Sequence, residues 1–116
     1  MMLVALHTRL LPGEEERYEE LHRAVWPEVL QRMREVGLRR YLIFRHGCEL
    51  FHLVECDDYD AAMAALAADP INQRWEATVA PLTAVPHDLS GGASDRMACI
   101  FDMPPDAPTT GPGDGP

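Results

Sequence analysis

Tyr18 and His22 are the two residues in this chain whose types and spacing could do chemistry together. They stand one helical turn apart, so in a helix a hydroxyl and an imidazole share one patch of surface. An imidazole has a pKa near neutrality and can both give and take a proton, which suits acid–base work. The alternative is a core histidine that donates a hydrogen bond to a nearby carbonyl, and the sequence pattern fits both roles.

A long amphipathic helix is expected to position this pair. Apolar residues recur at steps of three and four from residue 14 to residue 36, which predicts a helix with one inward face. Pro27 has no N–H for the carbonyl of Arg23, so we expect a kink just past the histidine. The inward face comprises Tyr18, Leu21, His22, Val25, Val29, Met33 and Val36.

The remaining elements predict a ferredoxin-like α+β fold. Strand, helix, strand, strand, helix, strand is the split βαβ order, which gives a four-stranded antiparallel sheet with helices on one face. The other face would stack on a second copy, as in a dimeric α+β barrel, so we expect a homodimer. The predicted strands are 2–10, 38–45, 49–56 and 96–103, the shorter helices are 59–68 and 70–80, and a loop covers 81–95.

Composition narrows the class of partner. With 19 acidic and 10 basic residues, the formal charge of −9 opposes binding to nucleic acid or to an anionic membrane surface and favours a small ligand. The three cysteines form no C-x-x-C pair, so free thiols in a reducing cytoplasm are expected. No signal peptide or membrane span is predicted. We expect one domain over 1–103 and a disordered Pro/Gly-rich tail over 104–116.

Two aromatic residues join the candidates for a site. Tyr41 lies in an aromatic-rich strand that the long helix must cover, and Trp75 lies on an inward helical row with Ile71 and Val79. Sugar rings stack on indoles, although core packing is the alternative for both residues. The other histidines show no metal-site spacing, and no nucleotide-binding or covalent-catalysis motif occurs, so no metal or cofactor is expected. These ordinary polar histidines are His7, His46, His52 and His87.

Together these residues resemble the L-rhamnose mutarotase family over about 3–103. The resemblance implies a ferredoxin-like homodimer that interconverts the α and β anomers of a six-carbon deoxy sugar without a cofactor. It also implies that His22 is the proton donor and that Tyr18 and Tyr41 bind the sugar. The motifs that carry it are Tyr18 with His22, Val25-Trp26-Pro27-Glu28, Tyr41, and Asn72-Gln73-Arg74-Trp75.

The chemistry of such a reaction suits these groups independently. Opening a pyranose ring removes a proton from the anomeric hydroxyl and delivers one to the ring oxygen, and an imidazole can do either. The reaction already proceeds in water, so positioning and acid–base help are enough. A small pocket with one histidine and two tyrosine hydroxyls therefore fits anomer exchange, and the resemblance implies a deoxyhexose, most simply L-rhamnose, as the sugar.

Glu76 departs from the family pattern, because the family commonly has a second tryptophan after the first. It is turned about 100° from Trp75 around the helix, so we expect it at the border of the pocket, where a carboxylate accepts hydrogen bonds from sugar hydroxyls. The alternative is that Glu76 faces water.

Two other functions share the predicted fold. One is a cofactor-free monooxygenase of the dimeric α+β-barrel type, which needs a larger apolar cavity for its substrate. The other is a non-catalytic small-molecule binding module, in which His22 is only packed. The fold cannot separate these functions from anomer exchange, so the site must.

Overall fold

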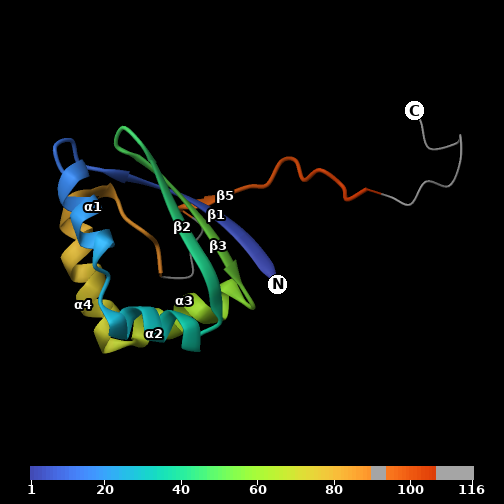
Figure 1. The fold of residues 1–116 in the computed structure, drawn as a ribbon, viewed down its shortest axis with the longest axis horizontal. Coiled ribbons are helices and arrows are strands. Elements are labelled where there is room, and N and C mark those ends of the chain that lie inside the picture. Colours follow the sequence, from blue (N-terminus) through green and yellow to red (C-terminus); the bar gives the residue numbers. More distant parts are fainter. Residues whose placement is uncertain (90–93, 107–116) are drawn as a thin grey trace, which may run out of the picture.

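Four α-helices cover one face of an antiparallel sheet in the residues that the structure describes, 1–89 and 94–106 (Figure 1). The structure is a computed structural model. The sheet order is β2-β3-β1-β4, with β5 also paired to β1, and this ferredoxin-like order confirms the predicted fold class. The strands are β1 (Met2–Leu10), β2 (Leu38–His46), β3 (Glu49–Cys56), β4 (Thr83–Val85) and β5 (Arg96–Met97). The helices are α1 (Glu15–Arg23), α2 (Pro27–Glu35), α3 (Tyr59–Ala68), α4 (Pro70–Val79) and the short 3₁₀ helix η1 (Ala80–Leu82). No helix among the described residues is long and apolar enough to cross a membrane.

The expected single helix over 14–36 is wrong, because the chain forms two helices with a break between them. Trp26 is extended, with φ −57° and ψ 131°, as the steric demand of a following proline favours. Pro27 then stands at the first helical position, where its missing N–H costs nothing. The break replaces the predicted kink, and α2 runs in a different direction from α1 (Figure 1).

Alternation along the strands divides the sheet into two faces. Leu6, Leu50 and Val54 point towards the helices and are buried. Phe51, whose neighbours across the sheet are Phe44 and His7, points to the opposite face and is partly exposed. The sheet therefore carries apolar side chains on both faces, while the helices in the described residues cover one face.

The C-terminal part of the prediction needs correction. The expected loop over 81–95 contains β4, which pairs with Arg9 and Leu10. The strand predicted over 96–103 is shorter, because only Arg96 and Met97 pair with β1. The outer edge of β1 is thus shared by β4 and β5, which no local pattern indicates. Of the predicted disordered tail, residues 107–116 lie outside the described residues, so that part stays a prediction.

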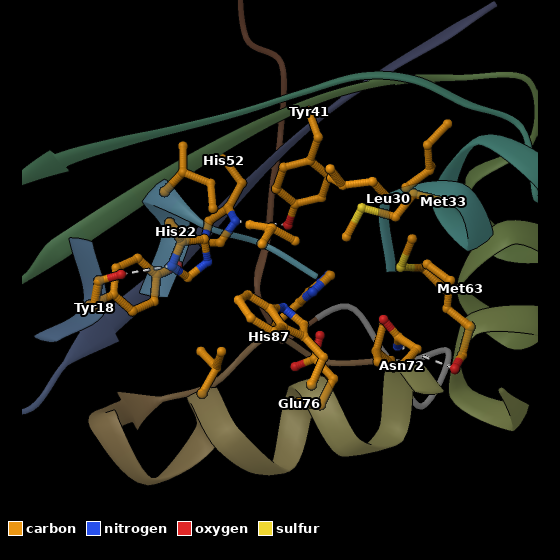
Figure 2. Close-up of a pocket in the computed structure, with 17 residues that line it drawn as sticks. Tyr18, His22, Leu30, Met33, Tyr41, His52, Met63, Asn72, Glu76 and His87 are labelled. Atoms are coloured by element: carbon orange, nitrogen blue, oxygen red, sulfur yellow. Dashed lines mark hydrogen bonds between the residues drawn. The ribbon is translucent and has the colours of Figure 1, made fainter. Parts of the chain in front are cut away.

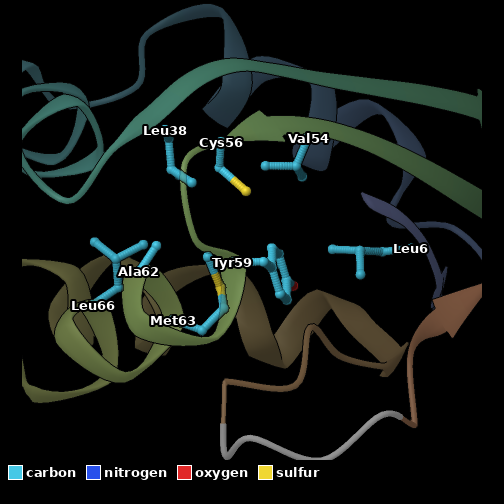
Figure 3. Packing of buried hydrophobic residues seen from close by; sticks show 8 residues of the cluster. All are labelled: Leu6, Leu38, Val54, Cys56, Tyr59, Ala62, Met63 and Leu66. Atoms are coloured by element: carbon cyan, nitrogen blue, oxygen red, sulfur yellow. The ribbon is translucent and has the colours of Figure 1, made fainter. Parts of the chain in front are cut away.

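The apolar core lies between the sheet and the helices in two clusters. One joins β1, β2 and β3 to α3 (Figure 3), and the other joins β1 and β3 to α1, α2 and α4. The first cluster comprises Leu6, Leu38, Val54, Cys56, Tyr59, Ala62, Met63 and Leu66, and the second Leu10, Tyr18, Val29, Leu50, Trp75 and Val79.

Asp69 holds the junction of α3 and α4, as the Asp-Pro sequence predicts. Its carboxylate accepts hydrogen bonds from the backbone N–H groups of Ile71 and Asn72 at 2.8 and 3.1 Å. The same carboxylate pairs with Arg32 of α2 at 2.9 Å. The cap therefore fixes the start of the helix that carries Trp75, and it ties that helix to α2.

We expect Asp69→Ala to lower the free energy of unfolding by about 1–2 kcal/mol, because two N–H groups lose their acceptor. Denaturant unfolding measures this change. Asp102→Ala is the matched control, since Asp102 is exposed and caps no helix. Equal stability of the two variants would contradict the assigned role of the cap.

Candidate active site

A cavity of about 330 Å³ lies between the sheet and the helices (Figure 2). This volume is at the small end of the range for ligand sites, roughly 300–1,000 Å³. Its walls come from α1, α2, β2, β3, α3, α4 and the segment after β4. The lining residues are Tyr18, His22, Val25, Leu30, Met33, Leu38, Tyr41, Ile43, His52, Met63, Leu66, Asn72, Trp75, Glu76, Val79, His87 and Leu89.

All five residues singled out in the sequence line this one cavity. Tyr18 and His22 come from α1, Tyr41 from β2, and Trp75 and Glu76 from α4. Residues distant in sequence are thus brought together around one space.

His22 is held by its own helix in a way that leaves one nitrogen available. Its Nδ1 donates to the carbonyl oxygen of Tyr18 at 2.8 Å, which fixes the neutral tautomer and leaves the lone pair on Nε2. Figure 2 shows the second nitrogen on the side of the cavity. Burial lowers the pKa of His22, and the hydrogen bond to Tyr18 partly opposes this shift. His22 thus makes the hydrogen bond to a carbonyl that is expected of a core histidine. The same bond orients Nε2.

Aromatic rings hold the His22 imidazole from two sides. The Tyr18 ring stacks on it with 4.1 Å between centroids, and the Trp75 ring meets it edge-on at 5.4 Å. Trp26, the extended residue before Pro27, meets Trp75 edge-on at 5.3 Å. Burial, and then the charge of Glu76, raises the pKa of Tyr18, so its hydroxyl stays protonated near neutrality.

A chain of three hydrogen-bonded side chains crosses the sheet to Tyr41. The Tyr41 hydroxyl lies 2.8 Å from Nδ1 of His52, and the Thr8 hydroxyl lies 2.8 Å from Nε2. A neutral imidazole has one N–H and one lone pair, so it donates to one hydroxyl and accepts from the other. Burial, and then the neighbouring His87, lowers the pKa of His52 to about 3. His52 therefore stays neutral and positions the Tyr41 hydroxyl.

His87 lies beside both His52 and Tyr41. Its ring centroid is 5.9 Å from that of His52 and 6.4 Å from that of Tyr41. Its Nε2 lies 3.1 Å from the Tyr59 hydroxyl and 3.7 Å from Oδ2 of the buried Asp95. Burial lowers the pKa of His87, whereas the charge of Asp95 opposes that shift. His87 is thus tied to the segment that leads into β5.

Glu76 points from α4 into the cavity (Figure 2). Among the described residues no hydrogen bond or ion pair is found for its carboxyl group, and no lysine or arginine lines the cavity. Burial alone raises the pKa of this carboxyl from its usual 4.5 to about 7. This shift brings the pKa of the group near neutrality, and its side chain lines the cavity.

Three lining residues were missed as site residues in the sequence. His52 shares the inward parity of β3 with Leu50 and Val54, and that alternation could have placed it. Asn72 is buried and donates to the Leu66 carbonyl at 3.2 Å, while its Oδ1 has no partner in the described residues. His87 follows β4, and no spacing predicts it. No group of three or more metal-binding side chains is found among the described residues.

Comparisons with known proteins give one consistent result. The model of the L-rhamnose mutarotase family matches residues 3–103. The L-rhamnose mutarotase of Burkholderia ambifaria (strain MC40-6) is 31% identical over 106 residues, which cover 90% of this chain and all of that protein.

Two solved structures share the fold. L-rhamnose mutarotase from Formosa agariphila superposes with a TM-score of 0.71 at 24% identity and covers 90% of this chain and 100% of its own. Tetracenomycin F2 cyclase from Streptomyces glaucescens, a type-II polyketide cyclase, gives a TM-score of 0.63 at 18% identity and covers 91% of this chain and 100% of its own.

We expect Glu76→Gln to stabilise the protein at high pH. Because burial raises the folded-state pKa of Glu76, wild-type stability falls as the pH rises from about 4.5 to about 7. At pH 8 the free energy of unfolding of the variant should exceed that of wild type by about 2–3 kcal/mol. At pH 4 the two proteins should differ little. Urea unfolding at both pH values checks this, with the exposed Glu28→Gln as control. A gain of equal size at both pH values would refute the burial argument.

Proposed function

This chain belongs to the L-rhamnose mutarotase family, and from that premise we propose that it interconverts the α and β anomers of L-rhamnose. The reaction opens the pyranose ring to the aldehyde and closes it again on either face of C1. One observation carries the proposal: a partly buried histidine with a free Nε2 shares a small cavity with two tyrosines and a carboxyl group.

His22 is the acid–base group in this proposal. Its Nδ1 bond to Tyr18 and the rings of Tyr18 and Trp75 fix the imidazole, so a proton on Nε2 is aimed at a bound ligand. In its charged form Nε2 gives a proton to the ring oxygen, which is the donor role that the family resemblance implies. Its lowered pKa makes that proton easy to release.

The remaining polar groups suit the hydroxyls of an uncharged sugar. Tyr18 and Tyr41 stay protonated, so each can donate to a sugar oxygen, and Oδ1 of Asn72 can accept. Trp75 supplies an apolar surface for a ring face. The lack of lysine and arginine along the described cavity wall supports a free sugar over a sugar phosphate.

The other two functions are not favoured. A monooxygenase for aromatic substrates calls for a larger apolar cavity, whereas this one is small and has polar groups on several walls. The similarity to a polyketide cyclase concerns the fold alone, and folds of this kind carry unrelated chemistries. A pure binding module gives no reason for an imidazole with one oriented, free nitrogen.

A homodimer is part of the proposal, and the outer face of the sheet supports it. Leu42, Leu53, Ala5 and Met97 are neighbours across four strands on that face, and Phe44 lies opposite Phe51. The Phe44 side chain is 57% exposed and Met97 is 44% exposed. An apolar sheet face of this extent fits stacking on the same face of a second copy.

The folded unit and its location complete the proposal. Residues 1–103 form the mutarotase domain, which the span of the family match supports. A cytoplasmic location is supported by three cysteines that are all free: Cys48, Cys56 and Cys99.

His22→Ala should lower the enzymatic rate of L-rhamnose anomer exchange by about 10²- to 10⁴-fold, because the proton-transfer group is lost. NMR exchange spectroscopy, corrected for the rate without enzyme, measures it. Circular dichroism should show the fold of wild type. His46→Ala is the control, since His46 is exposed and outside the cavity. Wild-type exchange by His22→Ala would remove the acid–base assignment.

Light scattering at micromolar concentration should give the mass of a dimer for wild type. Phe44→Lys should give a monomer, because a charge would be buried at the centre of the stacked faces. Ala64→Lys tests for a general effect of added charge, since Ala64 is an exposed residue of α3, which lies on the opposite face of the sheet. A monomeric wild-type protein would contradict the dimer.

A further inference from the structure

Glu76 is a partly buried carboxyl group that lines the cavity, and the fold supplies no counter-charge for it among the described residues. The ionisable groups that face it are Tyr18 and His22 from α1, Tyr41 from β2, His52 from β3, and His87 from the segment after β4. None is a permanent cation. A carboxylate with a purely structural role in a core is normally paired or hydrogen-bonded. The lack of such a partner for Glu76 indicates that its carboxyl group interacts with a ligand.

The other titratable side chains that line the cavity are either hydrogen-bonded or held in one protonation state. Both nitrogens of His52 are bonded to hydroxyls, and the Tyr41 hydroxyl is one of them. The Tyr18 phenol has a pKa raised by burial, so it does not ionise near neutrality. Nε2 of His87 faces Tyr59 and Asp95. Among the described residues that line the cavity, Nε2 of His22 and the Glu76 carboxyl are the two proton-exchanging groups for which no hydrogen-bond partner is found.

Anomer exchange needs two proton transfers at two oxygens, and one imidazole nitrogen cannot serve both at once. The Tyr18 ring stacks on His22 at 4.1 Å between centroids, and the charge of Glu76 acts on the Tyr18 hydroxyl, so His22 and Glu76 border the same part of the cavity. Resting on the proposed function, we propose that Glu76 is a second catalytic residue, which exchanges a proton with the anomeric oxygen while His22 serves the ring oxygen.

The step balances without any other reactant. On opening, the Glu76 carboxylate takes the proton of the O1 hydroxyl and the C1=O1 double bond forms. The C1–O5 bond breaks, its electron pair goes to O5, and O5 takes the proton from Nε2 of His22. The aldehyde group then turns about C1–C2. On closing, neutral Nε2 takes the O5 proton, O5 attacks the other face of C1, and the Glu76 carboxyl returns a proton to O1.

Throughout the catalytic cycle, Glu76 and His22 together must hold one transferable proton. The form with both groups charged and the form with both neutral contain the same number of protons, so the cycle draws none from solvent. Above about pH 7 the free pair loses that proton, since the more weakly acidic member is Glu76. At low pH, below the ordinary range of histidine, it gains a second one. The plot of kcat/KM against pH should therefore be bell-shaped.

Glu76→Gln tests this inference, because the amide keeps the shape and hydrogen bonds of the carboxyl but cannot transfer a proton. We expect kcat for L-rhamnose to fall about 10²-fold with little change in KM. The bell should collapse to a single ionisation, that of His22. Glu28→Gln should keep the wild-type rate and profile, and His87→Asn should keep the alkaline limb near pH 7. Circular dichroism of each variant verifies the fold.

The outcomes separate the two levels of the argument. Wild-type protein that fails to accelerate L-rhamnose anomer exchange would overturn the proposed function itself. An active wild type with a Glu76→Gln variant of equal kcat, or one with raised KM and an unchanged pH profile, would overturn the catalytic role of Glu76. If the pH profile of kcat/KM lost its alkaline limb in His87→Asn but kept it in Glu76→Gln, His87 and not Glu76 would be the second proton-transfer group.

Discussion

The arrangement of this molecule depends on the missing N–H of Pro27. That proline forces Trp26 out of the helical region and divides one amphipathic segment into α1 and α2. Each half keeps its apolar stripe, but the stripes now face a shared space from two directions. A continuous helix would have carried its inward residues along one straight line across the sheet. The break instead lets α1 present His22 and α2 present Met33 to the same cavity.

The pKa values of the ionisable residues that line the cavity are set mainly by desolvation, because few nearby charges oppose its effect. Burial is the largest cause of the pKa shift of every ionisable lining residue with a resolved shift: down for the histidines, up for the tyrosines and Glu76. All these shifts favour the neutral forms. The cavity thus suits a ligand that is polar but uncharged, and a proton moved within it meets little competition from water.

Much of the fold could be predicted because the deciding interactions are local. The bounds of β1, β3 and α3 follow from alternation and from Asp58, whose side chain caps the helix within three residues. The sequence predicts a kink at Pro27 because it shows the lost hydrogen bond. It does not show whether packing against the sheet stabilises one continuous helix or two separate ones. The site was predicted where residues share a helix face, as Tyr18 and His22 do. His87 and the environment of Glu76 depend on long-range packing, which leaves no periodic signal.

The strands of the sheet carry two tasks on alternate residues. In β3, His52 belongs to the cavity, and its neighbours Phe51 and Leu53 belong to the outer face. The two surfaces are therefore separable by parity: substitutions at even positions of β3 change the cavity lining, and those at odd positions change the outer face, each without altering the other. A single-residue insertion in such a strand has the opposite effect, because it would exchange the two sets and damage both surfaces at once. The strands should thus tolerate substitutions far better than changes of length.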